Sequence, residues 1–279
     1  MDDADGTPGT AAPGILAHYG EGDYEIDRLA QGRGQLERVR TQEILARHLL
    51  PPPAVLLDVG GGPGVYARWL AAQGYDVRLV DPVPLHVERA RQALAGYPSA
   101  SARLGHARRL DDPDASADAV LLLGPLYHLT ERADRLRALR EAARVLRPGG
   151  PLFAVGISRF TSLFDGLSAG FLDDPAFARI VDRDLREGQH RNPDNHPEYF
   201  TTAFFHHPDE LQAEVREAGL AVVEAVGIEG PGWWLPREFD AWWGDPERRE
   251  RLLAAVRAVE REPSVLGLGP HLMVVARKG

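Results

Sequence analysis

The chain has 279 residues, of which 44% are hydrophobic and 26% charged, and its formal net charge at pH 7 is −9. These values fit one globular domain with insertions, and the acidic balance argues against a nucleic-acid partner. The chain contains no cysteine, which excludes disulfides, thiolate metal sites and cysteine nucleophiles.

The first residues, 1–14, are acidic, small and turn-forming. They lack the basic start and apolar stretch of a secretory signal, and no apolar run approaches the ~18 residues of a membrane span. We therefore expect a disordered tail over residues 1–14, a single domain over residues 15–279, no membrane partner and a cytoplasmic location.

Predicted helices and strands alternate along the first half of the chain. Residues 35–50 place Leu36, Val39 and Ile44 near one helical face, and three prolines at 51–53 end that helix. Residues 54–59 form a short apolar run between proline and glycine, which is typical of a buried strand. The same patterns predict helices over 63–73, 84–95 and 131–146, and strands over 75–82, 101–106, 117–124 and 151–157.

The alternation breaks after residue 157. Residues 158–207 show no strand pattern and are predicted to form a partly helical insertion over the sheet's edge. A helix over 208–219, a strand over 220–227 and a last strand over 271–278 resume the pattern, interrupted by a second insertion, 229–263, that holds four of the five tryptophans. This order predicts an α/β fold with a doubly wound, seven-stranded, mostly parallel sheet; the core covers about 36–157 and 208–279. Ligands in such sheets bind outside the carboxyl ends of the strands, where the two insertions are expected to act as lids and pocket walls.

The sharpest motif is a glycine-rich loop, DVGGGPG at residues 58–64, between a predicted strand and a predicted helix. Its glycines, Gly60, Gly61, Gly62 and Gly64, allow a tight turn and a close approach to a ligand. Asp81 ends the next strand, where an acid can accept hydrogen bonds from both ribose hydroxyls of a nucleoside cofactor.

The spacing of this loop is G-x-G-x-G, and Val65 stands where the dinucleotide fingerprint would have its third glycine. DVGGGPG with VRLVDP after it resembles motif I and its partner acid in class I S-adenosylmethionine-dependent methyltransferases. The resemblance covers roughly residues 36–157 and 208–228 and the last strand; the two insertions have no match.

The resemblance implies S-adenosylmethionine as cofactor, S-adenosylhomocysteine as product and a role for several residues. The loop glycines are expected to contact the amino-acid part of the cofactor, with Asp58 beneath them near its amine and Gly124 below the sulfonium. Asp81 is expected to hold the ribose.

On the adenine side, the resemblance places Pro82 and Val83 beside the base. His106 stands where the family often has an acid that pairs with the adenine amine; its neutral ring is expected to accept a hydrogen bond there, unless the backbone of Ala107 substitutes. Arg40 either pairs with the cofactor's carboxylate or is an ordinary solvated helix arginine.

Methyl transfer from a sulfonium is an in-line displacement that depends largely on positioning, so a base is needed only if the acceptor must lose a proton early. His128 is a candidate general base or a capping or core histidine, and Tyr127 either lines the methyl channel or packs. His206 and its neighbour His207 are either catalytic or cap the following helix. No metal site is predicted, because the histidine spacings match none.

The tryptophan segment either walls an apolar acceptor pocket or packs as a lid or dimer surface, and a homodimer is one alternative for the assembly. Residues 166–170 match the nucleophile-elbow pattern G-x-S-x-G but lack a preceding strand, which argues against a serine hydrolase.

We therefore expect a methyltransferase acting on O, N or C of a small molecule, with a secondary metabolite as one candidate class. The rivals are a protein, peptide or RNA methyltransferase, a cofactor-binding regulatory protein without catalysis, and a nicotinamide oxidoreductase, which Val65 disfavours.

Overall fold

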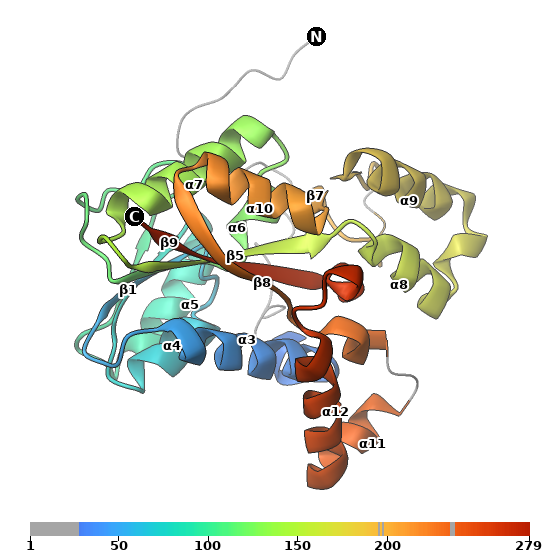
Figure 1. Ribbon diagram of the computed structural model, residues 1–279, viewed down its shortest axis with the longest axis horizontal. Coiled ribbons are helices and arrows are strands. Elements are labelled where there is room, and N and C mark those ends of the chain that lie inside the picture. The colour runs from blue at the N-terminus through green and yellow to red at the C-terminus, as the bar shows by residue number, and fades with distance from the viewer. Residues whose placement is uncertain (1–27, 195, 197, 235–237) are drawn as a thin grey trace.

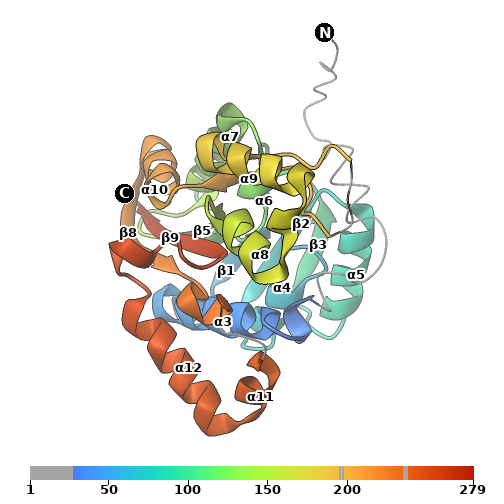
Figure 2. The same cartoon turned by 90° about the vertical axis from the view of Figure 1, so that its right-hand side faces the viewer.

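The computed structural model describes residues 28–194, 196, 198–234 and 238–279. The predicted tail over residues 1–14 lies outside the described residues. Within them the chain forms a single twisted sheet with helices on both faces, as Figures 1 and 2 show. The predicted α/β class and mostly parallel sheet are confirmed.

The parallel part of the sheet has the strand order β3-β2-β1-β4-β5. Its strands are β1 (Val55–Val59), β2 (Asp76–Asp81), β3 (Ser101–Leu104), β4 (Ala119–Leu122) and β5 (Pro151–Ser158). Every residue of β4 and β5 is buried, as expected for central strands covered on both faces. The order reverses between β1 and β4, and ligands of such sheets bind at this switch point.

Two antiparallel strands complete the far side. The last strand, β9 (His271–Lys278), pairs with both β5 and β8 (Leu220–Gly227). Both were predicted within a residue.

Residues 158–207 were expected to contain no strand, and this prediction is wrong. Two short strands lie there, β6 (Gln189–His190) and β7 (Ala203–His206), and they pair with each other. β7 also pairs parallel with Ile157 and Ser158 of β5, beyond the last β4 partner of β5 at Ala154. Strands this short depend on their pairing partners rather than on a sequence period, which explains why the pattern gave no signal.

The helices cover opposite faces of the sheet. On one face α3 (Gly34–His48), α4 (Val65–Ala71) and α5 (Pro84–Leu94) pack against strand side chains such as Leu56, Leu79 and Phe153. On the other face α6 (Pro125–His128), α7 (Arg132–Val145) and α10 (Pro208–Glu217) pack against the alternate strand side chains, such as Leu57 and Val120. The two-residue period of the strands thus divides the core into two layers.

The insertions are mainly helical. The first holds α8 (Thr161–Ala169), η1 (Phe171–Asp173) and α9 (Pro175–Glu187) beside the end of β5. The second holds η2 (Gly230–Trp234), α11 (Phe239–Gly244) and α12 (Pro246–Val259), followed by η3 (Pro263–Val265). Figure 2 shows α11 and α12 projecting from the body below α3. Trp242 and Trp243 pack there with Leu36 of α3, so this pair forms a satellite core.

Candidate active site

A cavity opens at the carboxyl ends of β1, β2 and β4, at the switch point of the sheet. Its walls carry the glycine loop and Asp81 on one side and the first turn of α6 on another. The lining residues are Arg28, Leu29, Glu37, Thr41, Asp58, Gly60, Gly61, Gly62, Pro63, Val65, Tyr66, Asp81, Pro82, Val83, His86, His106, Ala107, Leu123, Gly124, Pro125, Tyr127, His128, Leu129, Val155 and Ile228.

The glycine loop needs its glycines for conformation and for space. Gly60, Gly62 and Gly64 have φ angles of 69°, 56° and 89°, in the left-handed region that favours glycine. A Cβ on Gly61 would lie 2.6 Å from Oδ2 of Asp58, so the loop passes directly over that carboxyl group. The loop therefore presents bare backbone to the cavity.

Asp81 holds the loop in place. Its Oδ2 accepts a hydrogen bond of 2.9 Å from the Gly62 N–H, and its Oδ1 accepts one of 2.9 Å from the Val83 N–H. His86 of α5, which the sequence analysis did not single out, places Nδ1 3.2 Å from the same Oδ1. A carboxylate has about four acceptor positions, so Asp81 retains capacity for one hydroxyl group of a ligand, and for a second where His86 gives up its contact.

Asp58 is the least satisfied polar group of this wall. It is 1% exposed, and neither carboxyl oxygen has a hydrogen-bond partner among the described residues. Burial, and then the neighbouring carboxylate of Asp81, raise the pKa of Asp58 to about 7. A buried carboxyl group without donors matches a ligand that brings a cation or an N–H group.

His106, Ala107, Pro82 and Val83 all line the same cavity, and their contact with an adenine stays a prediction. Burial, followed by the positive charge of Arg108, lowers the pKa of His106 to about 4, so its ring is neutral at pH 7. The Arg108 N–H donates to His106 Nδ1 at 3.2 Å. The neutral ring then carries its hydrogen on Nε2, so His106 faces a ligand as a donor rather than as the expected acceptor.

The comparisons with known proteins agree with this geometry. Residues 56–150 match a family described as a methyltransferase domain. An uncharacterised methyltransferase of Mycobacterium bovis is 42% identical over 112 residues, which are 40% of this chain and 43% of that protein. The chain therefore spans less than half of this mycobacterial relative.

A longer match covers most of the domain. A ubiquinone biosynthesis O-methyltransferase of Xanthomonas axonopodis is 30% identical over 200 residues, covering 71% of this chain and 75% of that protein. This chain belongs to the class I S-adenosylmethionine-dependent methyltransferases. The cofactor of this methyltransferase is S-adenosylmethionine.

Solved structures share the fold at low identity. The geranyl diphosphate C-methyltransferase of Streptomyces coelicolor, solved with Mg²⁺, geranyl diphosphate and S-adenosyl-L-homocysteine, aligns with a TM-score of 0.56 and 14% identity. The alignment covers 97% of this chain and 90% of that one. At this identity the likeness supports the fold of the methyltransferase and nothing finer.

Another part of the cavity wall is formed by α6. Gly124 precedes this helix, and Tyr127 and His128 on it both line the cavity. Their rings pack edge to face with centroids 4.7 Å apart. A Cβ on Gly124 would lie 3.4 Å from the Tyr127 hydroxyl, so the residue below the predicted sulfonium position and the tyrosine are neighbours.

His206 does not lie with these residues, which corrects its prediction as a catalytic residue. It is fully buried, it does not line the cavity, and its Nε2 lies 3.4 Å from Glu214 Oε2. Burial lowers the pKa of His206. Its neighbour His207 stands at the N-cap of α10, where its N–H donates to Glu210 at 2.9 Å, in agreement with the capping alternative.

Both interpretations of Arg40 are also corrected. The side chain is neither solvated nor part of the cavity, since it is 0% exposed and forms ion pairs with Glu43 and Glu260. Its Nε also donates to the Ile228 carbonyl at 3.3 Å. Arg40 therefore ties α3 to the end of α12.

A further part of the cavity wall comes from residues that the sequence analysis missed. Arg28 and Glu37 form an ion pair that lines the cavity. Behind Glu37, His271 Nδ1 lies 2.7 Å from Glu229 and 3.8 Å from Glu37. Although burial opposes its charge, the carboxylates of Glu229 and Glu37 raise the pKa of His271 to about 9.

These groups balance one another in charge. The arrangement of Glu37, Glu229 and His271 is compatible with a metal ion in spacing, but the Arg28 guanidinium and the protonated imidazole already neutralise the two carboxylates. The sequence placed Glu37 on the same predicted helix as Leu36 and Arg40, but no sequence pattern linked Glu37 to Glu229 or His271.

Neither insertion contributes a described residue to the cavity wall, contrary to the expectation of lids and pocket walls. No described tryptophan lines the cavity: Trp242 and Trp243 pack beside α3, and the ring centroids of Trp234 and Phe164 lie 5.3 Å apart. Ser168 of the G-x-S-x-G match lies within α8 and bonds its own helix through Asp165, which agrees with the rejection of a nucleophile elbow. No helix of the described residues is long and apolar enough to cross a membrane.

Proposed function

We propose that this protein transfers the methyl group of S-adenosylmethionine to an oxygen, nitrogen or carbon atom of a small molecule. The observation that carries the proposal is one cavity bounded by the glycine loop with Asp58 and Asp81 on one side and by Tyr127 and His128 on the other. A donor held against the first wall would present its methyl group toward the second.

On the donor wall, the Asp58 carboxyl group receives the amine of the methionine part, which supplies the hydrogen bonds that its buried oxygens lack. Asp81 accepts the ribose hydroxyls while its bonds to Gly62 and Val83 keep the loop in shape. The adenine lies between Pro82, Val83 and Ala107, and the His106 Nε2–H donates to a ring nitrogen. Arg28, rather than Arg40, is the arginine placed to meet the carboxylate.

Bound S-adenosylmethionine supplies an activated methyl group on a positively charged sulfur. It would give up that group to an electron pair of the acceptor, and the carbon–sulfur bonding pair would stay on sulfur. The protein's work is therefore to align the acceptor and, where the acceptor is a hydroxyl or an amine, to take its proton. His128 is the imidazole placed for that step, with Tyr127 beside it to orient the acceptor.

A small acceptor is favoured by the walls of the cavity. Leu29, Leu129 and Ile228 surround the polar groups with apolar surface, which is typical of small-molecule sites. The Xanthomonas relative carries the name of a ubiquinone biosynthesis O-methyltransferase, which supports a small-molecule acceptor. A peptide end is the second candidate, because a chain terminus would fit the same walls.

The test begins with calorimetric titration of S-adenosylmethionine and of NADH into the purified protein. Micromolar binding of the first and none of the second is expected. An acceptor library of phenols, amines and short peptides is then screened for release of S-adenosylhomocysteine. His128→Gln should lower turnover about 100-fold without weakening donor binding, whereas the control His207→Gln should not. Failure of the folded protein to bind the donor would refute the proposal.

A further inference from the structure

The turn that follows α6 lies next to the cavity and contains backbone carbonyl groups that need hydrogen-bond donors. α6 is only four residues long and ends at His128, so its last carbonyl groups have no partner within a helix. Leu129, the next residue, lines the cavity and is buried. Whatever holds the carbonyls of Leu129 and Thr130 also determines where Tyr127 and His128 point.

One buried arginine holds both carbonyls. Arg135, in the first part of α7, is 2% exposed, and its Nη1 donates to the Leu129 oxygen and to the Thr130 oxygen, each at 2.9 Å. A planar guanidinium with five N–H groups can make both bonds and still bind a carboxylate with its other edge.

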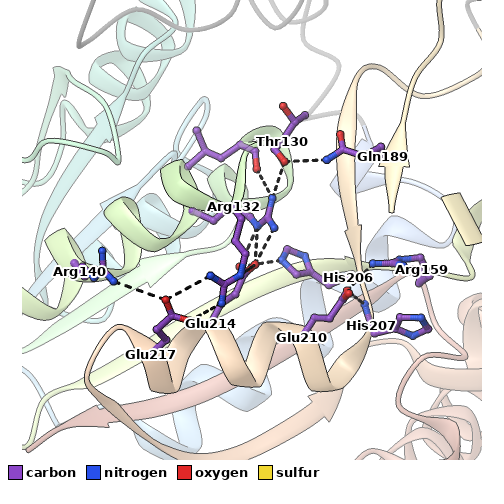
Figure 3. A network of polar contacts seen from close by, with 12 residues as sticks. Thr130, Arg132, Arg140, Arg159, Gln189, His206, His207, Glu210, Glu214 and Glu217 are labelled. Atoms are coloured by element: carbon purple, nitrogen blue, oxygen red, sulfur yellow. Dashed lines mark hydrogen bonds and ion pairs between the residues drawn. The ribbon is translucent and has the colours of Figure 1, made fainter. Parts of the chain in front are cut away.

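The other edge of Arg135 is fixed by groups from two distant elements. Its Nε and Nη2 donate to Glu214 of α10 at 2.9 and 2.8 Å, and its guanidinium centre lies 3.6 Å from the centre of the Phe204 ring of β7. His206 of β7 approaches the same carboxylate. Figure 3 shows Glu214 and His206 on one side of this network and Thr130 on the other.

The first insertion reaches the same turn. Gln189 of β6 donates to the Thr130 oxygen at 3.1 Å, as Figure 3 also shows, and the Phe200 ring stacks on His128 with centroids 6.1 Å apart. The insertion thus contacts the α6 turn without lining the cavity itself.

We propose that Arg135 is a positioning residue for methyl transfer: by bridging Glu214 to the carbonyls of Leu129 and Thr130, it holds the α6 turn so that Tyr127 and His128 face the donor. This inference rests on the proposed function for its catalytic consequence. Its structural consequence, the fixed position of His128, is independent of the acceptor.

Arg135→Lys tests the inference, since lysine keeps the charge beside Glu214 but cannot bridge to both carbonyls. Arg159→Lys is the matched control. Arg159 is equally buried, lies 5.7 Å from the same Phe204 ring, and pairs a carbonyl (Phe205, 2.8 Å) with a carboxylate (Glu210, 2.6 Å), but it does not touch the α6 turn.

The first readout is the imidazole NMR signal of His128 in ¹⁵N-histidine-labelled protein, assigned with His128→Gln. In Arg135→Lys this signal and its titration should differ from wild type, and amide exchange in residues 125–131 should rise about tenfold or more, as expected for a lost bond from a charged donor. Arg159→Lys should leave both unchanged, and neither variant should alter S-adenosylmethionine affinity more than about twofold.

The second readout is turnover with an acceptor found as described above. Arg135→Lys should lower kcat roughly 10- to 100-fold at an unchanged KM for the donor, because catalysis is sensitive to small misplacements. If the His128 signal and the exchange are the same in both lysine variants, Arg135 is merely structural and the inference is overturned. That result is separate from a failure of the donor to bind, which would refute the proposed function instead.

If Arg135→Lys does not fold, Arg135→Met combined with Glu214→Leu replaces it, because an apolar pair in place of a buried ion pair generally folds. The same change in the His128 signal is expected from this double variant. A wild-type signal would overturn the inference.

Discussion

The proposed site has a donor wall, the glycine loop with Asp58 and Asp81, and an acceptor wall, α6 with Tyr127 and His128. The contacts that hold these two walls span different distances along the chain. On the donor wall, Asp81 bonds Gly62 and Val83, which lie 19 and 2 positions from it. On the acceptor wall, Arg135 joins a neighbouring turn to Glu214, 79 positions away. The donor wall is a local product of one strand–loop–helix unit and the next strand, whereas the acceptor wall exists only once the second half of the chain has folded over α6.

The same contrast separates the arginines. Arg40 pairs with Glu260, which lies 220 positions away along the chain. Arg135 pairs with Glu214 and so belongs to the network that holds the acceptor wall. Both are fully buried, and their helical patterns alone would place them on ordinary helix surfaces. Long-range ion pairs thus decide which arginines serve the site and which serve the fold.

The largest expected effect tests Arg40 as a residue of the fold. Arg40→Ala removes a fully buried guanidinium that pairs with Glu43 and Glu260, while Arg47 still pairs with Glu260, so the free energy of unfolding should fall by about 3 kcal/mol in urea titrations. Donor affinity of the remaining folded protein should stay unchanged. Arg251→Ala, an exposed ion pair on the same α12, is the control and should cost less than about 0.5 kcal/mol. A loss of donor binding without a loss of stability would show instead that Arg40 belongs to the binding site.

Asp81→Ala tests the local character of the donor wall. Loss of the bonds to the Gly62 and Val83 N–H groups, together with the ribose contact, should weaken S-adenosylmethionine binding about 100-fold or more. Calorimetry measures the change. Asp76→Ala, at the other end of β2 and 38% exposed, should bind like wild type; equal binding by both variants would contradict the assignment.

Gly61→Ala tests the fit between the loop and Asp58. The added Cβ would meet Asp58 Oδ2 at 2.6 Å and Leu79 Cδ1 at 2.7 Å, so overpacking should cost about 1–3 kcal/mol of stability in thermal unfolding. Gly96→Ala has no atom within 4 Å of the new Cβ and should unfold as wild type does. Equal stability of the two variants would show that the loop moves freely.

The last prediction concerns pH. Because the pKa of Asp58 is raised to about 7 in the fold, the native state holds a proton that the unfolded chain gives up near pH 4, and this contribution to stability is lost as pH rises from about 4 to 7. The positively charged donor favours the ionised carboxylate. The affinity of the protein for S-adenosylmethionine should therefore rise by up to about tenfold per pH unit below pH 7 and level off above pH 7. Asp58→Asn should remove this dependence in calorimetry; a flat wild-type profile would contradict it.

The fold and the donor wall could be inferred largely from the residues alone. Strand periodicity, proline and glycine boundaries and the loop at 58–64 are local signals, and they placed the longer helices and the strands of the core within about two residues, although they gave no helix at α6. Asp58, Asp81 and the loop glycines follow from the same unit, since the physical requirement for a tight, side-chain-free turn acts over a few residues.

Tyr127 and His128 were also predicted from the sequence, but other parts of the cavity wall could not be inferred in this way. His86, Arg28 and Glu37 enter the cavity, and Arg40 and His206 leave it, because of packing between segments far apart in the chain. The short strands β6 and β7 likewise depend on pairing with each other and with β5. A buried charged side chain pairs with an opposite charge that folding brings close to it. No pattern in the sequence indicates which segments far apart in the chain will lie close together.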